Sequence, residues 1–280
     1  HLPWNLGQFG SNTTFTMTRT NYVAAIDALE KLLEIAAIDL GGSPSDYDIA
    51  DERVYLKSDP SIFITYANAA ARAIELRGKY SGQYVPEDIN SMTSRSVQAL
   101  AGTGLIGVAK DNLEKEGTVP ALAAGFIQIE LDLETGKYEI LDYLGVADCG
   151  TVIHPRGLEI QVKGAAVMGF GMAGYERHAY DPQNGLPAGV GFHNSKLPTY
   201  LDSPTPMDWA ATDIPDPQNP VGAKGIGEPI QGCAAAALLC AISDALGGHL
   251  FNRVPVTADM IVNVASGRQQ SHGRVQTNTT

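Results

Sequence analysis

The sequence predicts an α+β fold with two subdomains of mixed hairpins and helices. Apolar residues recur at helical spacing in several segments, and a strong hairpin pattern lies between them. These elements do not alternate in the regular βαβ order of a doubly wound parallel sheet. We therefore expect one subdomain over residues 1–110, a second over 111–268 and a polar tail over 269–280.

The first subdomain is expected to contain two helices and two short strands. Its opening helix shows an apolar face opposite a charged one, and paired glycines end it. In chain order, we predict a helix over 22–40 that ends at Gly41-Gly42, strands over 53–56 and 62–64, a helix over 66–76 with Thr65 as N-cap, and a weakly periodic connection over 78–120.

The second subdomain is expected to open with a β-hairpin. Ile and Leu alternate with Gln, Glu and Asp on both sides of the turn Glu134-Thr135-Gly136-Lys137. Helical patterns follow, separated by a stretch rich in Pro, Gly and Asp. The predicted elements are strands over 126–133 and 138–146 and helices over 158–172, 230–246 and 257–265.

Composition narrows the classes of function. The formal net charge of −12 argues against a nucleic-acid partner, because binding to phosphate backbones requires clustered Lys and Arg. No apolar run reaches the roughly 18 residues of a membrane span, so we expect a soluble, cytoplasmic protein. Because the sequence opens at His1 without a start methionine, we also expect a processed or truncated product.

The chain lacks the spacing of direct metal ligands. Cys149, Cys233 and Cys240 form no C-x-x-C or C-x-x-H pattern, so the chain cannot assemble an iron–sulfur cluster or a structural zinc site. The scattered histidines form no H-E-x-x-H pair. Any metal is therefore expected to arrive on a cofactor.

The clearest chemical motif is Gly222-Ala223-Lys224-Gly225-Ile226-Gly227-Glu228-Pro229, directly before a small-residue helix. The glycines allow a ligand to approach the backbone closely. Pro229 suits the first helical turn and favours an extended Glu228, so we expect this carboxylate just outside the helix. From the residues alone, Glu228 is either a fixed functional carboxylate or a solvated group that complements the helix dipole.

Two further segments carry polar groups near predicted helix starts. Gln8-Phe9-Gly10-Ser11-Asn12-Thr13-Thr14 concentrates hydroxyl and amide groups, so it is either an anion-binding loop or a loop that caps its own helix. Asp148-Cys149-Gly150-Thr151 leads towards Gln161 on a helix of small residues, where a glutamine is either a ligand contact or a satisfied core group.

These segments, in this order, resemble the C-terminal part of the molybdenum subunit of the xanthine dehydrogenase and aldehyde oxidase family. The Lys-Gly-x-Gly-Glu-Pro turn followed by Cys-Ala-Ala-Ala-Ala-Leu-Leu is similar to the segment that carries the family's catalytic base, which implies that role for Glu228. Gly-Ser-x-Thr-Thr is similar to a segment that holds the pterin phosphate, although Asn12 replaces a common arginine. The implied cofactor-binding residues are Phe9, Gly10, Ser11, Asn12, Thr13, Thr14, Gln161, Lys224, Gly225, Ile226 and Gly227.

The resemblance implies hydroxylation of an aldehyde or an N-heterocycle, with water as the oxygen source and Glu228 as the base that accepts a proton. It implies a molybdenum–molybdopterin cofactor, in the cytosine dinucleotide form common in bacterial relatives. The implied partners are the upstream half of the molybdenum subunit, an iron–sulfur subunit and an FAD subunit, because this chain cannot carry the electrons away by itself.

Two other hypotheses stay open at the level of sequence. Gly222, Gly225 and Gly227 echo a dinucleotide-binding fingerprint, but the Pro-rich segment 214–220 before them does not resemble a buried β-strand. The stronger alternative is a non-catalytic cofactor-binding or assembly module that is inactive without its other half.

Overall fold

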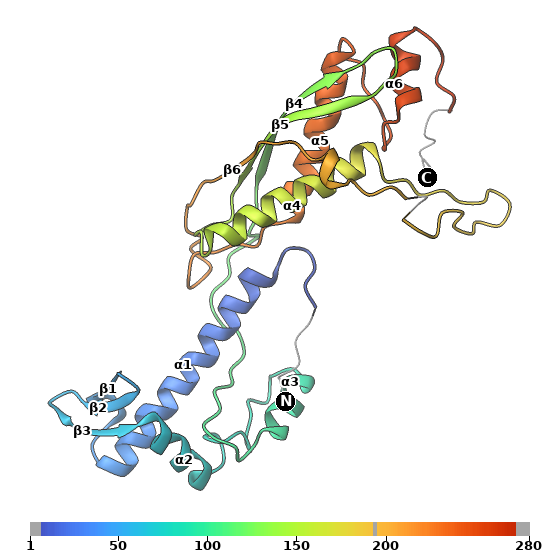
Figure 1. Ribbon diagram of the computed structural model, residues 1–280. Helices are drawn as coiled ribbons and strands as arrows, with labels where there is room; N and C mark the ends of the chain where they lie inside the picture. Colours follow the sequence, from blue (N-terminus) through green and yellow to red (C-terminus); the bar gives the residue numbers. More distant parts are fainter. Residues whose placement is uncertain (1–6, 193–194, 273–280) are drawn as a thin grey trace. The chain divides into compact units, whose positions relative to one another are not determined.

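The computed structural model describes residues 7–192 and 195–272, which form two compact units (Figure 1). Among the described residues, unit 1 contains 7–9, 13–117 and 217–221, and unit 2 contains 10–12, 118–216 and 222–272. The main division lies between Gly117 and Thr118, whereas the sequence predicts it between 110 and 111. Each unit combines helices with a small sheet, so the predicted α+β class is confirmed.

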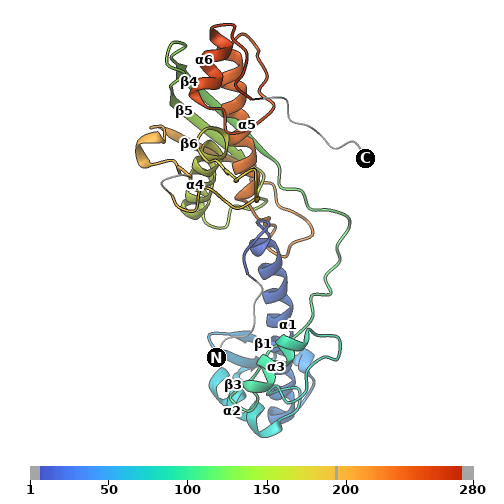
Figure 2. The ribbon, with the colours of Figure 1, turned by 90° about the vertical axis from the view of Figure 1, so that its right-hand side faces the viewer.

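Unit 1 packs a three-stranded antiparallel sheet and a short helix against a long helix (Figure 2). The sheet order is β1-β2-β3, and the core lies around Ile35 and Ala36 of the long helix and Val54 of the central strand. The elements are α1 (Thr13–Leu40), η1 (Pro44–Asp46), β1 (Tyr47–Ala50), β2 (Arg53–Leu56), β3 (Asp59–Thr65), α2 (Tyr66–Leu76) and α3 (Ser91–Ala99).

The start of α1 differs from the prediction. The helix begins at Thr13 rather than Tyr22. The sequence did not predict its first turns, because they lack an apolar face and are rich in threonine. Arg19 lies in this stretch and is nevertheless buried, with its guanidinium bound to both carboxylate oxygens of Asp111 and to the carbonyls of Leu113 and Glu114. This tertiary interaction stabilises a helical segment that local propensity does not favour.

Other elements of unit 1 were partly predicted. Helix α2 has the predicted limits, and the Thr65 hydroxyl accepts a hydrogen bond from the Asn68 amide, which confirms the N-cap. Strand β1 and helix α3 were missed. β1 is defined by pairing with β2, and α3 buries only Val97, so neither has an apolar pattern of its own.

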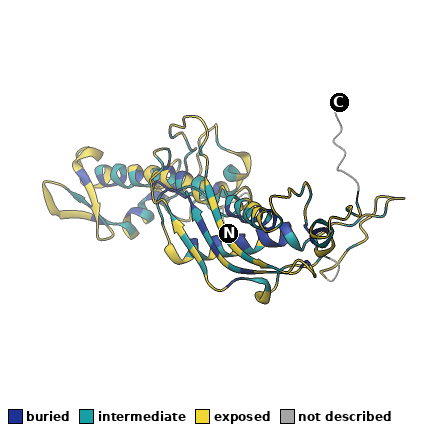
Figure 3. Ribbon diagram, turned by 90° about the horizontal axis from the view of Figure 1, so that it is seen from above, coloured by how far each residue is buried: buried dark blue, intermediate teal, exposed yellow. Residues whose placement is uncertain are grey.

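Unit 2 is a two-layer arrangement in which two long helices cover one face of a three-stranded sheet (Figure 1). β4 and β5 form the predicted antiparallel hairpin, and β6, which was missed in the Pro-rich stretch, pairs in parallel with β5. Intermediate and exposed residues alternate along β4, whereas buried residues recur along β5 and are most frequent towards its end (Figure 3). The elements are β4 (Ala123–Leu131), β5 (Tyr138–Ala147), α4 (Pro155–Gly174), η2 (Tyr200–Asp202), β6 (Met207–Ala211), α5 (Glu228–Ala245) and α6 (Ala258–Ala265).

Small residues bring α5 close to its neighbours. A Cβ at Gly169 of α4 would lie 2.5 Å from the Gln231 carbonyl oxygen, and one at Gly125 of β4 would lie 3.1 Å from the Cys233 carbonyl oxygen. Ile230, Ala234 and Leu238 of α5 are fully buried in the core that these contacts enclose. The start of α5 is therefore held by close packing on two sides. Within the two described ranges, no helix has the length and apolarity that crossing a membrane requires.

Candidate functional site

The glycine-rich segment leads directly into the first turn of α5. Gly227 is the N-cap residue at φ = 155°, a backbone conformation that favours glycine, and its carbonyl accepts hydrogen bonds from the amides of Ile230 and Gln231. Glu228 is the first residue of the helix, not the extended residue outside it that the sequence predicts, and its side chain is exposed. The carboxylate is thus fixed at a helix N-terminus yet accessible.

Ser11 is hydrogen-bonded to Glu228 twice, although 217 positions separate them in the sequence. The Ser11 hydroxyl donates to Glu228 Oε2 at 2.9 Å and accepts from the Glu228 backbone amide at 3.0 Å. Ser11 adopts a left-handed conformation with φ = 52°, which is uncommon for a residue other than glycine. One hydroxyl therefore both caps the first turn of α5 and fixes the carboxylate of that turn.

The backbone of Gly225 lies directly against the backbone of Ser11. A Cβ at position 225 would lie only 1.4 Å from the Ser11 carbonyl oxygen, so no larger residue fits. A Cβ at Gly227 would lie 3.3 Å from both Gln161 Oε1 and Ser11 Oγ. Unit 2 thus brings together three distant segments: residues 10–12, Gln161 in α4 and residues 225–228.

Lys224 is engaged with protein groups. Its ammonium donates to Asp148 Oδ2 at 2.6 Å and to the Pro120 carbonyl at 2.9 Å. The two paired side chains are only 10% and 23% exposed, so water screens the ion pair weakly. Lys224 is expected from the sequence to bind a cofactor, but in the structure its ammonium binds Asp148. The role of Asp148 could not be predicted from the sequence, because no local pattern connects positions 148 and 224.

Backbone pairing fixes the start of the glycine-rich segment. Ala223 forms an antiparallel bridge with Gly150, and the amide of Lys224 donates to the Cys149 carbonyl at 2.7 Å. Burial raises the pKa of the Cys149 thiol, so this cysteine is protonated at neutral pH. Cys149 therefore acts here through its backbone carbonyl, not as a thiolate.

The other sequence-predicted residues are distributed between the units. Ile226 is partly buried and packs against the core of unit 2. Gly10 and Asn12 are exposed residues of unit 2, on either side of Ser11. The structure assigns the remaining three residues to unit 1: Phe9, which is exposed, and Thr13 and Thr14, which form the first turn of α1.

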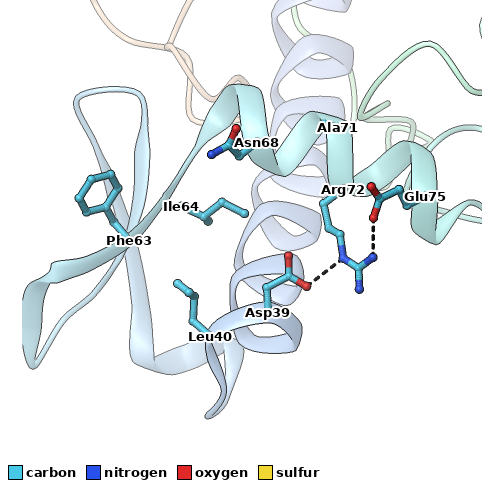
Figure 4. Close-up of a pocket in the computed structure, with 8 residues that line it drawn as sticks. All are labelled: Asp39, Leu40, Phe63, Ile64, Asn68, Ala71, Arg72 and Glu75. Carbon is cyan, nitrogen blue, oxygen red and sulfur yellow. Dashed lines mark hydrogen bonds and ion pairs between the residues drawn. The ribbon is translucent and has the colours of Figure 1, made fainter.

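Unit 1 has a separate hollow that contains none of these residues (Figure 4). It is lined by the end of α1, by β3 and by α2. Arg72 lies across it and pairs with Asp39 at 2.9 Å and with Glu75 at 2.7 Å. Since the single guanidinium is already paired with two carboxylates, the hollow has no unpaired cation for an anionic ligand.

The geometry defines what the site in unit 2 can do. An exposed carboxylate at a helix N-terminus can accept a proton, and Ser11 holds it in one orientation. Near it, the exposed Gln161 offers a side-chain amide that can donate and accept hydrogen bonds. Among the described residues, no group of three or more His, Cys, Asp and Glu side chains could hold a metal ion.

Comparisons with known proteins give consistent matches. Residues 1–204 match the family described as molybdopterin cofactor-binding domain. The chain is 29% identical over 267 residues to the 6-hydroxypseudooxynicotine dehydrogenase complex subunit gamma of Paenarthrobacter nicotinovorans, covering 95% of this chain and 31% of that subunit. It is 28% identical over 227 residues to the carbon monoxide dehydrogenase large chain of Afipia carboxidovorans, covering 81% of this chain and 25% of that protein.

The fold of this chain is also similar to that of a solved structure. The crystal structure of the Cu,Mo-CO dehydrogenase in its carbon monoxide reduced state superposes with a TM-score of 0.69 and 26% sequence identity. The match covers 95% of this chain and 31% of that chain. The chain therefore spans about a third or less of the length of the proteins it matches.

Proposed function

Because this chain belongs to the family of molybdopterin cofactor-binding domains, we propose that it supplies part of the active site of a molybdenum hydroxylase. The enzyme would hydroxylate an aldehyde or an N-heterocycle with water as the oxygen source. The observation that carries the proposal is the convergence of Ser11, Gln161 and the segment 225–228 in unit 2. Three segments remote in sequence meet around one accessible carboxylate.

The residues present fit a pterin cofactor. Gly225 and Gly227 carry no Cβ that would meet Ser11 or Gln161, so the backbone of 225–227 can lie directly beside these two polar residues. The Gln161 amide can donate to and accept from ring heteroatoms of such a group, and the Ser11 hydroxyl, whose proton goes to Glu228, keeps one lone pair that can accept. We propose that Gly10, Ser11, Asn12, Gln161 and the glycine backbone bind it.

Glu228 is the proposed base. When bound, the molybdenum–pterin group supplies a two-electron acceptor, which no amino-acid side chain offers. Glu228 accepts the proton released as oxygen from water bonds to the substrate carbon, and Ser11 orients the carboxylate through Oε2.

The complete enzyme requires further polypeptide. This chain spans 31% of the length of its Paenarthrobacter relative, and its three cysteines do not have the spacing of iron–sulfur ligands. We therefore propose that it works in a cytoplasmic, heteromeric complex. The other components would be the rest of the molybdenum subunit, an iron–sulfur subunit and an FAD subunit. We also propose the cytosine dinucleotide form of the pterin.

Cofactor analysis tests the proposal. The 280-residue chain would be purified alone and in complex with co-expressed partner chains, and molybdenum and the pterin nucleotide would be quantified in each preparation. We expect near-stoichiometric molybdenum only in the complex. Near-stoichiometric metal in the chain alone would contradict the proposal that it forms part of a site. A complex that is active without molybdenum would refute the assigned chemistry.

A further inference from the structure

We propose that Asp148 is a positioning residue that holds Glu228 in place through Lys224. The inference rests on the proposed function, because it assumes that the position of Glu228 matters for catalysis. It gives Lys224 a role different from cofactor binding. It also gives Asp148 a role that its own sequence segment does not suggest.

The ion pair connects the glycine-rich segment to the sheet of unit 2. Asp148 directly follows β5, whose Tyr143 and Ala147 are 1% and 0% exposed. Lys224 bonds to Asp148 and also to the carbonyl of Pro120, just before β4. A charge-assisted hydrogen bond between poorly exposed groups is among the stronger polar contacts in a protein. Because Ala123 and Ala147 pair with each other, the lysine binds its segment to two adjacent strands at one end of the sheet.

The ion pair lies next to a flexible segment of the chain. Only Gly225, Ile226 and Gly227 separate Lys224 from Glu228, and the two glycines have little conformational stiffness. The contact between Gly225 and Ser11 lies within this stretch, and it brings the Ser11 hydroxyl to Glu228. Movement of Lys224 would therefore separate Ser11 from Glu228.

Helix α5 does not depend on the ion pair. Its buried residues Ile230, Ala234 and Leu238 anchor it in the core of unit 2. Loss of the ion pair is thus expected to loosen the segment before Glu228 while the helix stays folded. This separation makes a positioning effect distinguishable from general destabilisation.

Hydrogen–deuterium exchange on the 280-residue chain tests the structural part. In Lys224→Met and in Asp148→Asn, peptides over 222–228 should exchange about 10-fold faster, with exchange in 230–245 unchanged. Lys163→Met is the matched control, because it breaks another lysine–carboxylate pair, to Glu159 at 2.6 Å on the more exposed surface of α4. It should leave residues 222–228 unaffected. Unchanged exchange in both ion-pair variants would overturn the proposal.

A charge reversal separates positioning from cofactor binding. In the assembled enzyme, Asp148→Asn should lower kcat about 10- to 100-fold with cofactor content and KM nearly unchanged. The double variant Lys224→Asp with Asp148→Lys should restore most of the kcat, because it rebuilds the pair in reverse. Lost cofactor in Lys224→Met that the double variant does not restore would identify Lys224 as a cofactor ligand and refute the proposal. Faster exchange in Asp148→Asn with a normal kcat would also refute it.

Glu228→Gln distinguishes failure of the proposed function from failure of the positioning role of Asp148. If Glu228→Gln keeps full activity, the proposed function fails while the exchange data still report on the ion pair. If Glu228→Gln is inactive and the Asp148 variant exchanges and turns over normally, only the positioning proposal fails.

Discussion

Substitution of Gly225 by alanine tests the backbone contact on which the site depends. The added Cβ would lie 1.4 Å from the Ser11 carbonyl oxygen, whereas ordinary contact begins at 3.4 Å. The two backbones must therefore separate by about 2 Å, because neither partner at this contact is a flexible side chain.

A displacement of this size would break both hydrogen bonds between Ser11 and Glu228. They measure 2.9 and 3.0 Å, and a bond of 3.6 Å or more no longer counts as one. Misplacement of a catalytic group by about 1 Å can cost about 10²-fold in rate, so we expect at least that loss of turnover in Gly225→Ala. The overpacked contact should also lower the free energy of unfolding by about 1 to 3 kcal/mol.

Gly232→Ala, in the helix α5 that follows Gly225, is the matched control. Gly232 is exposed, and a Cβ there would meet nothing within 4 Å. Alanine in a helix interior stabilises by about 0.5 to 1 kcal/mol relative to glycine, so this variant should be active and slightly more stable. Turnover and cofactor content of the assembled enzyme would be measured together with urea unfolding of the 280-residue chain. Normal turnover in Gly225→Ala would refute the claim that the Ser11 contact positions Glu228.

Glu228→Gln keeps the size of the side chain but cannot accept the proton, so turnover should fall about 10²- to 10⁴-fold at constant molybdenum and pterin content. Near-normal turnover would remove Glu228 from the mechanism, and lost cofactor would make it structural. Ser11→Ala should lower turnover of the folded enzyme by about 10²-fold, because it removes both hydrogen bonds that orient Glu228. Normal turnover in this variant would show that the Ser11 hydroxyl does not position the carboxylate. Arg19→Met should lower the free energy of unfolding by about 3 to 5 kcal/mol in urea titrations, since it leaves the Asp111 carboxylate without its buried partner. The exposed Arg95→Met should change stability by less than about 0.5 kcal/mol, and equal effects would refute the reasoning.

The local sequence was sufficient to predict those elements whose own residues show a capping, helical or turn pattern. The Thr65 cap, helix α2 and the hairpin around Gly136 follow the sequence prediction because capping, helical spacing and turn chemistry act over a few residues. The placement of Glu228 at a helix N-terminus was predictable from Pro229 for the same reason. Its assignment to the first turn of α5, not to an extended residue, was not.

The same limit explains the missed elements. Strand β1 exists through its pairing with β2, and β6 through its pairing with β5. The first turns of α1 are helical although their threonines favour other conformations, because Arg19 anchors them to Asp111. In each case a partner distant in sequence stabilises a segment that shows no pattern by itself.

The sequence by itself determined the α+β class, the family resemblance and the identity of the candidate carboxylate. Only the tertiary structure decided that Ser11 binds Glu228 and that Lys224 binds Asp148, across 217 and 76 positions. A glycine motif indicates that close approach is possible, but it does not identify the group that approaches. The partners are set by how the packed elements of unit 2 bring distant segments together, and a side chain that can form an ion pair with several groups pairs with the one that the fold places beside it.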